Sequence, residues 1–445
     1  MKKSLFAVAA TTAFTGAAQA QSSVTVYGLL DVGYTNGDAR VSSGTTNAKQ
    51  NVSRISNSME SGSRIGFRGN EDLGGGTSAQ FVFELGIQPA GNGGSNADGS
   101  TSAPAATTAA SQSSSSNASA PNWTPNIRQA FVGITQKGLG TARVGTQNTL
   151  YWEQAGSNTA GQLSQTAGSM LAPTIDGAFF NTTTLNGTTN TIVNGAAFGA
   201  YSTRTTNTIN FRTERMSGAM LKASWTQSNQ NTNQTTPANT NSASNSFTGG
   251  TSNQQGYQAA LDWNIQKANI QASYAAFKSE NPNGAVTLSA SCTGAGAACT
   301  GTGSTAGGTT AWGGGVMGNN VNDTQALITA SYDFGILKAY AGWAQRKLSN
   351  TYNSNQYLQR TAQEIGVRGY VTKSIEGWAS VGNGRYTTWQ NTGVTANITG
   401  YQVGSNYWMS KRTNFYAIYG QNGTSSTSNG SANVGQASVG VRHTF

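Results

Sequence analysis

Short segments of alternating apolar and polar side chains recur along this chain, and they are joined in turn by short turns and long polar loops. In the segment 257–265, Leu261 and Trp263 fall on one face. Asp262 and Asn264 fall on the other. Successive side chains of a β-strand point to opposite faces, so each segment predicts a strand with one apolar and one polar surface. Segments of about ten residues with this alternation, and with turns short on one side and long on the other, are typical of transmembrane β-barrels.

The pattern predicts sixteen strands. They cover residues 24–34, 63–70, 79–87, 128–134, 141–146, 207–214, 220–227, 257–265, 268–278, 325–334, 337–345, 364–372, 375–386, 401–409, 414–421 and 434–445. The expected fold class is therefore all-β, a 16-stranded antiparallel transmembrane β-barrel with short periplasmic turns and long extracellular loops; 14 or 18 strands are the alternatives. A barrel of about this size encloses an aqueous channel.

Composition excludes the other common fold classes. Charged residues make up 9% of the chain, compared with roughly 25% in soluble domains. The 9 Trp, 16 Tyr and 15 Phe argue against a disordered chain, in which aromatic residues are depleted. A helical membrane protein needs apolar stretches of about 20 residues, and the mean hydropathy here is −0.40.

Residues 1–20 have the organisation of a secretory signal peptide. Lys2 and Lys3 give a basic start, residues 5–14 are apolar, and Ala18 and Ala20 supply the small side chains of a cleavage site. The alternative is a buried N-terminal helix. Removal of residues 1–20 leaves the barrel domain, residues 21–445, with 24 basic and 16 acidic residues, a formal charge of +8.

The polar face of the predicted strands indicates a water-filled interior, because an outward apolar face would contact lipid. This face carries Arg64, Arg68, Glu84, Lys222, Asn264, Gln271, Thr329, Lys338 and Arg368. The longest loop of the first half, residues 147–203, contains an apolar patch at 170–180. A loop longer than about 15 residues is usually functional or disordered. We expect this one to fold into the lumen and narrow it; the alternative is an exposed external loop.

The sequence gives little support for catalysis, metal binding or nucleic-acid binding. The single histidine, His443, leaves no basis for a Ser-His-Asp triad or a zinc centre, so we expect no enzyme, cofactor or metal site. Basic residues are scattered rather than clustered, which argues against nucleic-acid binding. Cys292 and Cys299 lie close together in a predicted loop. In an exported protein such a pair is expected to form a disulfide.

Four segments of the chain resemble one known family. They read SSVTVYGLLDVGY, SGSRIGFRGNEDLGGG, RQAFVGI followed by LGTARVGTQNTL, and SVGVRHTF at the C-terminus. This set resembles the Gram-negative general porins, especially the beta-proteobacterial type, over essentially the whole mature chain. The resemblance implies an outer-membrane location, a homotrimer, and a third loop that folds into the pore opposite a ladder of basic wall residues.

The same resemblance assigns residues to the pore constriction. Arg64 in SRIGFRG and Arg128 in RQAFVGI match the basic wall residues, and Arg143 and Arg54 are further candidates from the alternation. Asp176, near the middle of the long loop, would be the opposing acidic residue. The chain departs from the family at Thr146, where relatives carry an arginine. Phe445 would serve as the C-terminal signal to the outer-membrane assembly machinery.

The expected function is passive diffusion of small hydrophilic solutes and ions through an aqueous channel. Basic rings favour anions, so the charge of +8 and the basic lumen residues indicate a mild anion preference. The basic balance could also serve contact with membrane lipid and lipopolysaccharide. The alternatives are a non-conducting structural or adhesin-type barrel and a secreted β-solenoid, although the short fixed repeat of a solenoid is missing.

Overall fold

The computed structural model describes most of the predicted barrel domain. The described residues are 23–43, 46–57, 59–87, 89–90, 126–162, 164–171, 184–185, 188–189, 201, 203–235, 248–280, 321–351, 354–355, 357–389, 393–426 and 430–445. The predicted signal peptide, the Cys292–Cys299 pair and Asp176 lie outside them.

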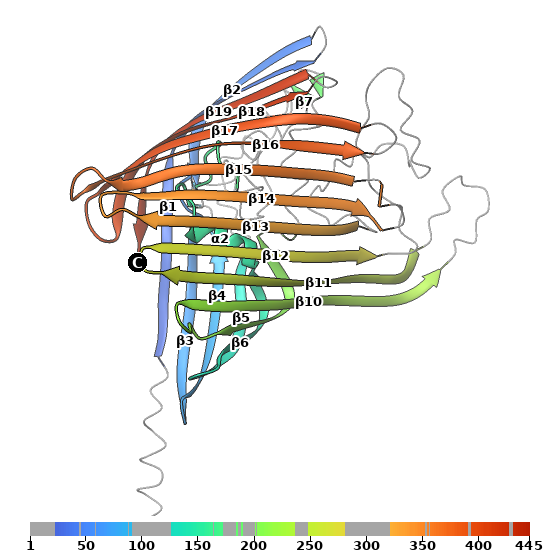
Figure 1. Ribbon diagram of the computed structural model, residues 1–445, viewed down its shortest axis with the longest axis vertical. Helices are drawn as coiled ribbons and strands as arrows, with labels where there is room; N and C mark the ends of the chain where they lie inside the picture. The colour runs from blue at the N-terminus through green and yellow to red at the C-terminus, as the bar shows by residue number, and fades with distance from the viewer. Residues whose placement is uncertain are drawn as a thin grey trace, which may run out of the picture.

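Seventeen strands form one antiparallel sheet (Figure 1). They are β1 (Ser23–Ser43), β2 (Thr46–Asn57), β3 (Arg64–Gly74), β4 (Thr77–Gly86), β5 (Asn126–Gln136), β6 (Gly140–Asn148), β9 (Arg204–Thr213), β10 (Ala219–Thr235), β11 (Thr248–Ile265), β12 (Ala268–Glu280), β13 (Val321–Asp333), β14 (Lys338–Asn350), β15 (Tyr357–Tyr370), β16 (Ile375–Trp389), β17 (Gly393–Trp408), β18 (Thr413–Ser426) and β19 (Gly430–Thr444). Strands β7 (Thr184–Leu185) and β8 (Thr188–Thr189) form a separate short hairpin.

The sheet closes on itself through β1. One edge of β1 pairs with β19, from Leu29 opposite Thr444 to Ser42 opposite Ser431. The other edge pairs with β3 over residues 23–29 and with β2 over residues 32–43. Strands β2 and β3 therefore act as one interrupted wall strand, and the seventeen named strands make a closed barrel of sixteen. The predicted strand number is confirmed.

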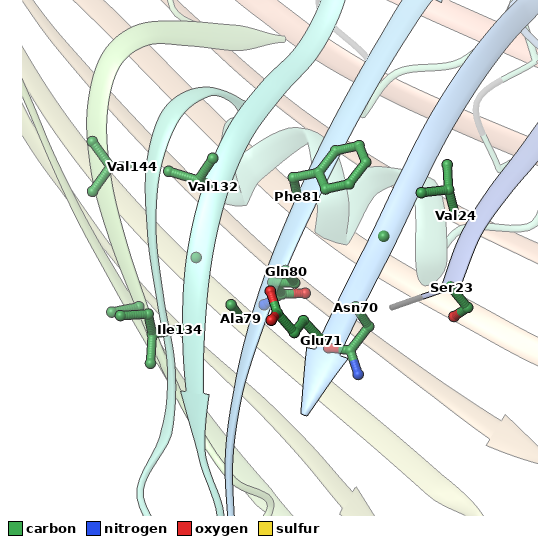
Figure 2. A pocket seen from close by; sticks show the side chains of 13 residues that line it. Ser23, Val24, Asn70, Glu71, Ala79, Gln80, Phe81, Val132, Ile134 and Val144 are labelled. Atoms are coloured by element: carbon green, nitrogen blue, oxygen red, sulfur yellow. The ribbon is translucent and has the colours of Figure 1, made fainter. Parts of the chain in front are cut away.

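The outer face of the wall carries exposed apolar side chains, as predicted. On β18, Phe415 and Tyr419 are 46% and 40% exposed on this face. The inner face of the same strand also carries apolar side chains, Tyr416 and Ile418, each 3% exposed, so it is less polar there than predicted. An apolar hollow of about 470 Å³ lies on the outer face, across β3 to β6 and the start of β1. Figure 2 shows Val24, Phe81, Val132 and Val144 around it, with α2 behind the strands.

Strand β2 was not predicted, because this stretch was interpreted as a loop to about residue 50 followed by a strand from residue 63. Strand β1 also continues nine residues beyond Tyr34, the predicted end. In these stretches the outer face carries polar side chains such as Arg40 and Lys49. With polar residues on both faces, the period-2 signal disappears although the strand pairing continues.

The helix α2 (Leu150–Ser157) follows β6 and lies inside the barrel. Its N-cap is Thr149, whose side chain accepts a hydrogen bond from the Trp152 backbone N–H, the usual role of an N-cap hydroxyl. The helix packs against β11, β12 and β13, and in Figure 1 it lies behind the near strands. Within the described part of the chain, no helix is long and apolar enough to cross a membrane.

The turn between β3 and β4 gives a test of local backbone conformation. Gly75 has a φ of +61°, and a Cβ there would meet nothing within 4 Å. A left-handed conformation costs an L-residue about 1–2 kcal/mol, so Gly75→Ala should lower the free energy of unfolding by about 1 kcal/mol in urea titrations of the refolded protein. The control is Gly377→Ala, where a Cβ makes an ordinary contact with Val371; equal losses in both variants would contradict the expectation.

Candidate pore constriction

Residues 149–171, here called the inward loop, cross the barrel interior between β6 and β9. The first part is α2, which is fixed to the wall strands by side-chain amides. The Gln154 Nε2 donates to the carbonyl oxygens of Leu261 and Ala272, at 3.0 Å each. The Asn158 Nδ2 donates to the Thr329 Oγ1 at 3.1 Å. These contacts hold the helix against β11, β12 and β13.

The middle of the inward loop continues along the inner face of the next strands. Arg368 on β15 donates to the Ala160 carbonyl oxygen at 2.9 Å. Gln402 on β17 donates to the Thr166 carbonyl oxygen. The Ala167 N–H donates to the Gln436 Oε1 on β19 at 2.9 Å. A glycine is required beneath this segment, because a Cβ at Gly420 would collide with the Ala167 carbonyl oxygen.

The loop then turns back, and a buried carboxylate fixes its end. Glu364 on β15 accepts from the Met170 N–H at 2.6 Å and from the Ser169 Oγ at 3.3 Å. The Arg360 guanidinium donates to the Met170 carbonyl oxygen at 2.8 Å. Tyr151 on α2 closes the loop onto itself by donating to the Leu171 carbonyl oxygen at 2.6 Å. Residues 149–162 and 164–171 therefore contact the inner face of the wall; the rest of the predicted loop, with most of its apolar patch at 170–180, lies outside the described residues.

A first charged cluster lies on the wall of strands β1, β3, β4 and β5, and brings together three of the predicted pore residues. Arg128 Nε lies 2.7 Å from Glu84 Oε1, and Arg64 Nε lies 3.8 Å from Glu84 Oε2. The Tyr27 hydroxyl donates to the same carboxylate at 3.0 Å. These four side chains and Trp152 of α2 line one hollow.

A second charged cluster forms where α2 faces β9 and β10. Glu153 of α2 makes ion pairs with Arg212, at 2.5 Å, and with Lys222, at 3.2 Å. Glu153 also lines the hollow of the first cluster. Burial alone would raise the pKa of the Glu153 carboxyl, but Arg212 and Lys222 hold this pKa below its ordinary value of 4.5.

The two clusters together are basic. Arg64, Arg128, Arg212 and Lys222 supply four positive charges, and Glu84 and Glu153 supply two negative charges, which leaves +2. Arg143 lies with its guanidinium carbon 4.9 Å from the centre of the Phe131 ring. A positively charged narrowing in a low-dielectric wall raises the local concentration of anions.

A second segment, residues 59–63, also folds inward at the interruption between β2 and β3. Met59 accepts a hydrogen bond from the Gln165 N–H of the inward loop at 2.9 Å. Glu60 accepts from Asn406 at 2.8 Å and from Asn414 at 2.9 Å. The carboxylate of Asp31 holds the segment by accepting from the Glu60 N–H at 2.9 Å. The interior wall and both inward segments therefore form one packed unit.

The remaining predicted site residues occupy other parts of the barrel. Arg54 lies on β2 opposite Thr35, on the inward face. Arg68 lies 5.3 Å from the Tyr27 ring centre. Lys338 pairs in register with Arg368, which forms an ion pair with Glu376 at 2.7 Å.

Phe445 ends the chain beside Gly28, with reciprocal backbone hydrogen bonds of 3.0 and 3.1 Å.

Several charged residues of the interior were missed from the sequence, among them Arg212, Glu364, Glu153 and Glu60. Arg212 carried a usable signal, because it lies on the polar face of the predicted strand 207–214. Glu153 and Glu60 carried no such signal, because both lie in stretches predicted to be loops. A loop has no alternation that shows which side chains face the interior. The acidic partner of the basic wall was expected at Asp176, whereas the described acidic partners are Glu84 and Glu153.

Comparison with known proteins places this barrel in a family. The model of the Gram-negative porin family matches residues 7–429. The chain belongs to the Gram-negative porin family. Porins of this family lie in the outer membrane, which they cross with strands.

Two curated relatives match part of the porin. An outer membrane porin protein of Bordetella pertussis is 45% identical over 106 residues, 22% of this chain and 27% of the relative. Outer membrane porin protein 32 of Delftia acidovorans is 48% identical over 90 residues, 19% of this chain and 22% of the relative. The aligned stretches therefore span about a quarter of these relatives.

Solved structures resemble the porin over almost its full length. An anion-selective porin from Comamonas acidovorans has a TM-score of 0.56 at 17% identity, and the match covers 96% of this chain and all of that one (100%). The trimer form of OmpT from Vibrio cholerae has a TM-score of 0.53 at 12% identity, and covers 95% of this chain and 99% of that one. At these identities the likeness shows the shared fold.

The lowered pKa of Glu153 predicts how the constriction responds to acid. A depressed folded-state pKa means that the ion pairs contribute stability above the unfolded value of 4.5, and lose it as the pH falls through the lower folded value. We expect the single-channel conductance to stay constant from about pH 7 to about pH 5 and to change only in stronger acid. In Glu153→Gln the side chain is neutral at every pH, so this variant should show at neutral pH the conductance that the unmodified porin shows only in strong acid. A change of conductance above pH 5 in the unmodified porin that is absent from Glu153→Gln would contradict the lowered pKa.

The role of Glu364 in holding the inward loop can be tested in planar bilayers. Glu364→Ala removes the carboxylate that accepts from the Met170 N–H and the Ser169 hydroxyl. Leaving a buried donor unsatisfied costs about 1–3 kcal/mol, so we expect higher mean conductance and more open-channel noise. Gln363→Ala on the outer face of the same strand is the control. Conductance equal to that of the unmodified porin in both variants would mean that Glu364 does not hold the loop.

Proposed function

We propose that this porin forms a water-filled channel for passive diffusion of small hydrophilic solutes and ions, with a preference for anions. The observation that carries the proposal is the excess of two positive charges in the two clusters between the inward loop and the wall. The structurally similar porin from Comamonas acidovorans is described as anion-selective, which supports this preference. Selectivity follows from fixed charge, because rings of Arg and Lys favour anions in a pore.

Glu84 and Glu153 give the basic constriction a defined geometry. Each carboxylate lies between two cations: Glu153 accepts hydrogen bonds from both Arg212 and Lys222, and Glu84 accepts one from Arg128 and pairs with Arg64 at 3.8 Å. A long basic side chain held by an ion pair loses freedom to swing across the lumen, so its charge stays at the wall and the centre stays open. The cost is a partial reduction of the positive potential, which makes the anion preference mild.

The porin is proposed to assemble as a homotrimer. The trimer form of the similar OmpT from Vibrio cholerae supports this assembly. The wall strands β3 to β6 are 9 to 11 residues long, compared with 17 and 18 for β10 and β11. Their outer face carries the apolar hollow of Figure 2. A short apolar wall is suited to burial against other subunits rather than to contact with a thick lipid layer.

Further expectations concern residues outside the pore wall. Residues 1–20 are proposed to direct export, and Cys292 with Cys299 to form a disulfide in the oxidising compartment that results. Asp176 is proposed to add acidic charge to the constriction. Phe445, with its backbone paired to Gly28, is proposed as the signal that the outer-membrane assembly machinery reads.

A non-conducting structural or adhesin-type barrel is the second candidate. Such a barrel would have the same closed wall but no open channel, and its inward loop would only fill the interior. Conductance of the refolded porin in a planar bilayer separates the two functions, because only a channel passes current at low protein density.

The anion preference can be tested with a pair of opposite charge changes at one site. At about 6 Å in the dielectric of water, one charge is worth about 0.7 kcal/mol, or roughly a threefold change in local anion concentration. Arg64→Gln with Arg128→Gln should therefore shift the reversal potential in a KCl gradient toward cations. Glu84→Gln should shift it toward anions.

The control for this series is Arg385→Gln, which changes a charge on the outer face of β16. It should leave the reversal potential unchanged. Equal reversal potentials in all four proteins would refute the assignment of Arg64, Arg128 and Glu84 to the selective narrowing, while current through any of them would still establish a channel.

A further inference from the structure

An aromatic ring and two basic side chains lie side by side on the inner wall at β1 and β3. Tyr27 on β1 is opposite Gly66 on β3. Arg64 and Arg68 are the next inward residues of β3 on either side of Gly66, because every second side chain of a strand points to the same face. The Arg68 guanidinium carbon lies 5.3 Å from the centre of the Tyr27 ring. The register therefore places one arginine on each side of the ring along the wall.

The missing side chain at Gly66 allows the Tyr27 ring to lie against the backbone of β3. A Cβ at Gly66 would meet the Tyr27 Cζ at 2.5 Å and the hydroxyl oxygen at 2.7 Å. The same hydroxyl donates to Glu84 at 3.0 Å, which fixes the far end of the ring. Tyr27 also lines the hollow of the first charged cluster. The ring therefore forms a fixed aromatic surface at the side of that hollow.

The hollow beside this ring has room for a small solute. Its volume is about 520 Å³, and small-molecule sites are commonly roughly 300–1,000 Å³. Trp152 lines it from the inward loop, and Gln129 and Ser157 add a side-chain amide and a hydroxyl. The lining thus combines aromatic surface with hydrogen-bond donors.

Arg64 is the more accessible cation of this hollow. Its side chain is 28% exposed, compared with 6% for Arg128. The Arg64 Nε lies 3.8 Å from the Glu84 Oε2, which is beyond hydrogen-bond distance. The Arg64 Nη1 donates to the Gly62 carbonyl oxygen in a long hydrogen bond of 3.3 Å. These contacts are weak, so Arg64 can bind a carboxylate that enters the hollow.

We propose that this hollow binds small aromatic carboxylates on their way through the channel, in preference to aliphatic carboxylates of the same charge. The carboxylate contacts Arg64, and the aromatic ring of the solute stacks on Tyr27 beside Arg68. Aromatic pairs favour offset stacking, and a guanidinium group is attracted to an aromatic face. The inference rests on the channel function proposed above and names one class of solute for it.

Other small solutes fit this lining less well. An inorganic anion would use Arg64 but gain nothing from the Tyr27 ring. A neutral sugar could stack on the ring but would gain nothing from the two arginines. A primary amine would be repelled by the excess charge of +2 in the two clusters.

The test compares benzoate with cyclohexanecarboxylate, which have the same charge and similar size but differ in aromaticity. Each acid is added at neutral pH to planar bilayers that hold many copies of the porin, and the concentration that halves the chloride current is measured. We expect this concentration to be about three- to tenfold lower for benzoate, the range that an aromatic pair contributes. Tyr27→Leu should make the two concentrations equal. Gly66→Ala should do the same, because it displaces the ring without changing any charge.

Two further variants separate charge from aromaticity. Arg64→Gln should raise the half-inhibiting concentrations of both acids by the same factor, because it removes a charge that attracts both. The matched control is Tyr340→Leu, which removes an inward ring that lies 5.2 Å from the Lys338 Nζ but does not line the hollow. This variant should keep the preference for benzoate. The chloride current of each variant confirms that it folds.

Equal half-inhibiting concentrations of the two acids in the unmodified porin would overturn the proposal, while the chloride current would still establish a channel. A preference for benzoate that Tyr27→Leu retains, or that Tyr340→Leu also removes, would overturn the assignment to this hollow. Inhibition by benzyl alcohol at the benzoate concentration would contradict the role of Arg64, because the ring would then bind without a carboxylate. A barrel that passes no chloride current would refute the proposed function and this inference with it.

Discussion

The structure depends on the requirement that every backbone N–H and C=O in a lipid environment has a hydrogen-bond partner. An open sheet would leave two unpaired edges in hydrocarbon, each group costing several kcal/mol. The pairing of β1 with β19 removes both edges. The reciprocal bonds between Gly28 and Phe445 complete this seam at the last residue of the chain. Closure then forces one face of every strand inward, and the pore exists because that face is polar.

The inward loop must be held in place within an interior that contains water. The inward loop cannot rely on apolar burial alone, so wall side chains bind its backbone at several points. Gln402 and Glu364 of the wall bind the backbone of the loop, and Gln154 of the loop binds backbone carbonyls of the wall. Apolar contacts add to this where space permits, as with Met170 beside Tyr386 and Ile398. Small residues such as Gly420 provide the room.

Much of this architecture could be predicted from the sequence, because lipid on one side and water on the other impose a period of two. That signal located a segment of each of the sixteen wall strands, although β10, β11 and β17 extend eight or nine residues beyond the predicted segments. It also placed Arg64, Glu84 and Lys222 on the inner face. The signal ends where both sides of the wall are wet, so β2 and the extension of β1 were not predicted. Loops show no such alternation. The ion pairs of Glu153 and the hydrogen bonds of Glu60 depend on contacts between segments that are distant in the chain, and a local sequence pattern does not predict such contacts.

The interruption between β2 and β3 has a mechanical consequence. Met59 accepts a hydrogen bond from Gln165 of the inward loop, and Glu60 is bound to β17 and β18. The loop is therefore braced at its middle by a second segment that is itself part of the wall. A displacement of the loop alone would break its contacts with the wall and with residues 59–63. The width of the aperture is therefore expected to change only when the interrupted strand moves together with the loop.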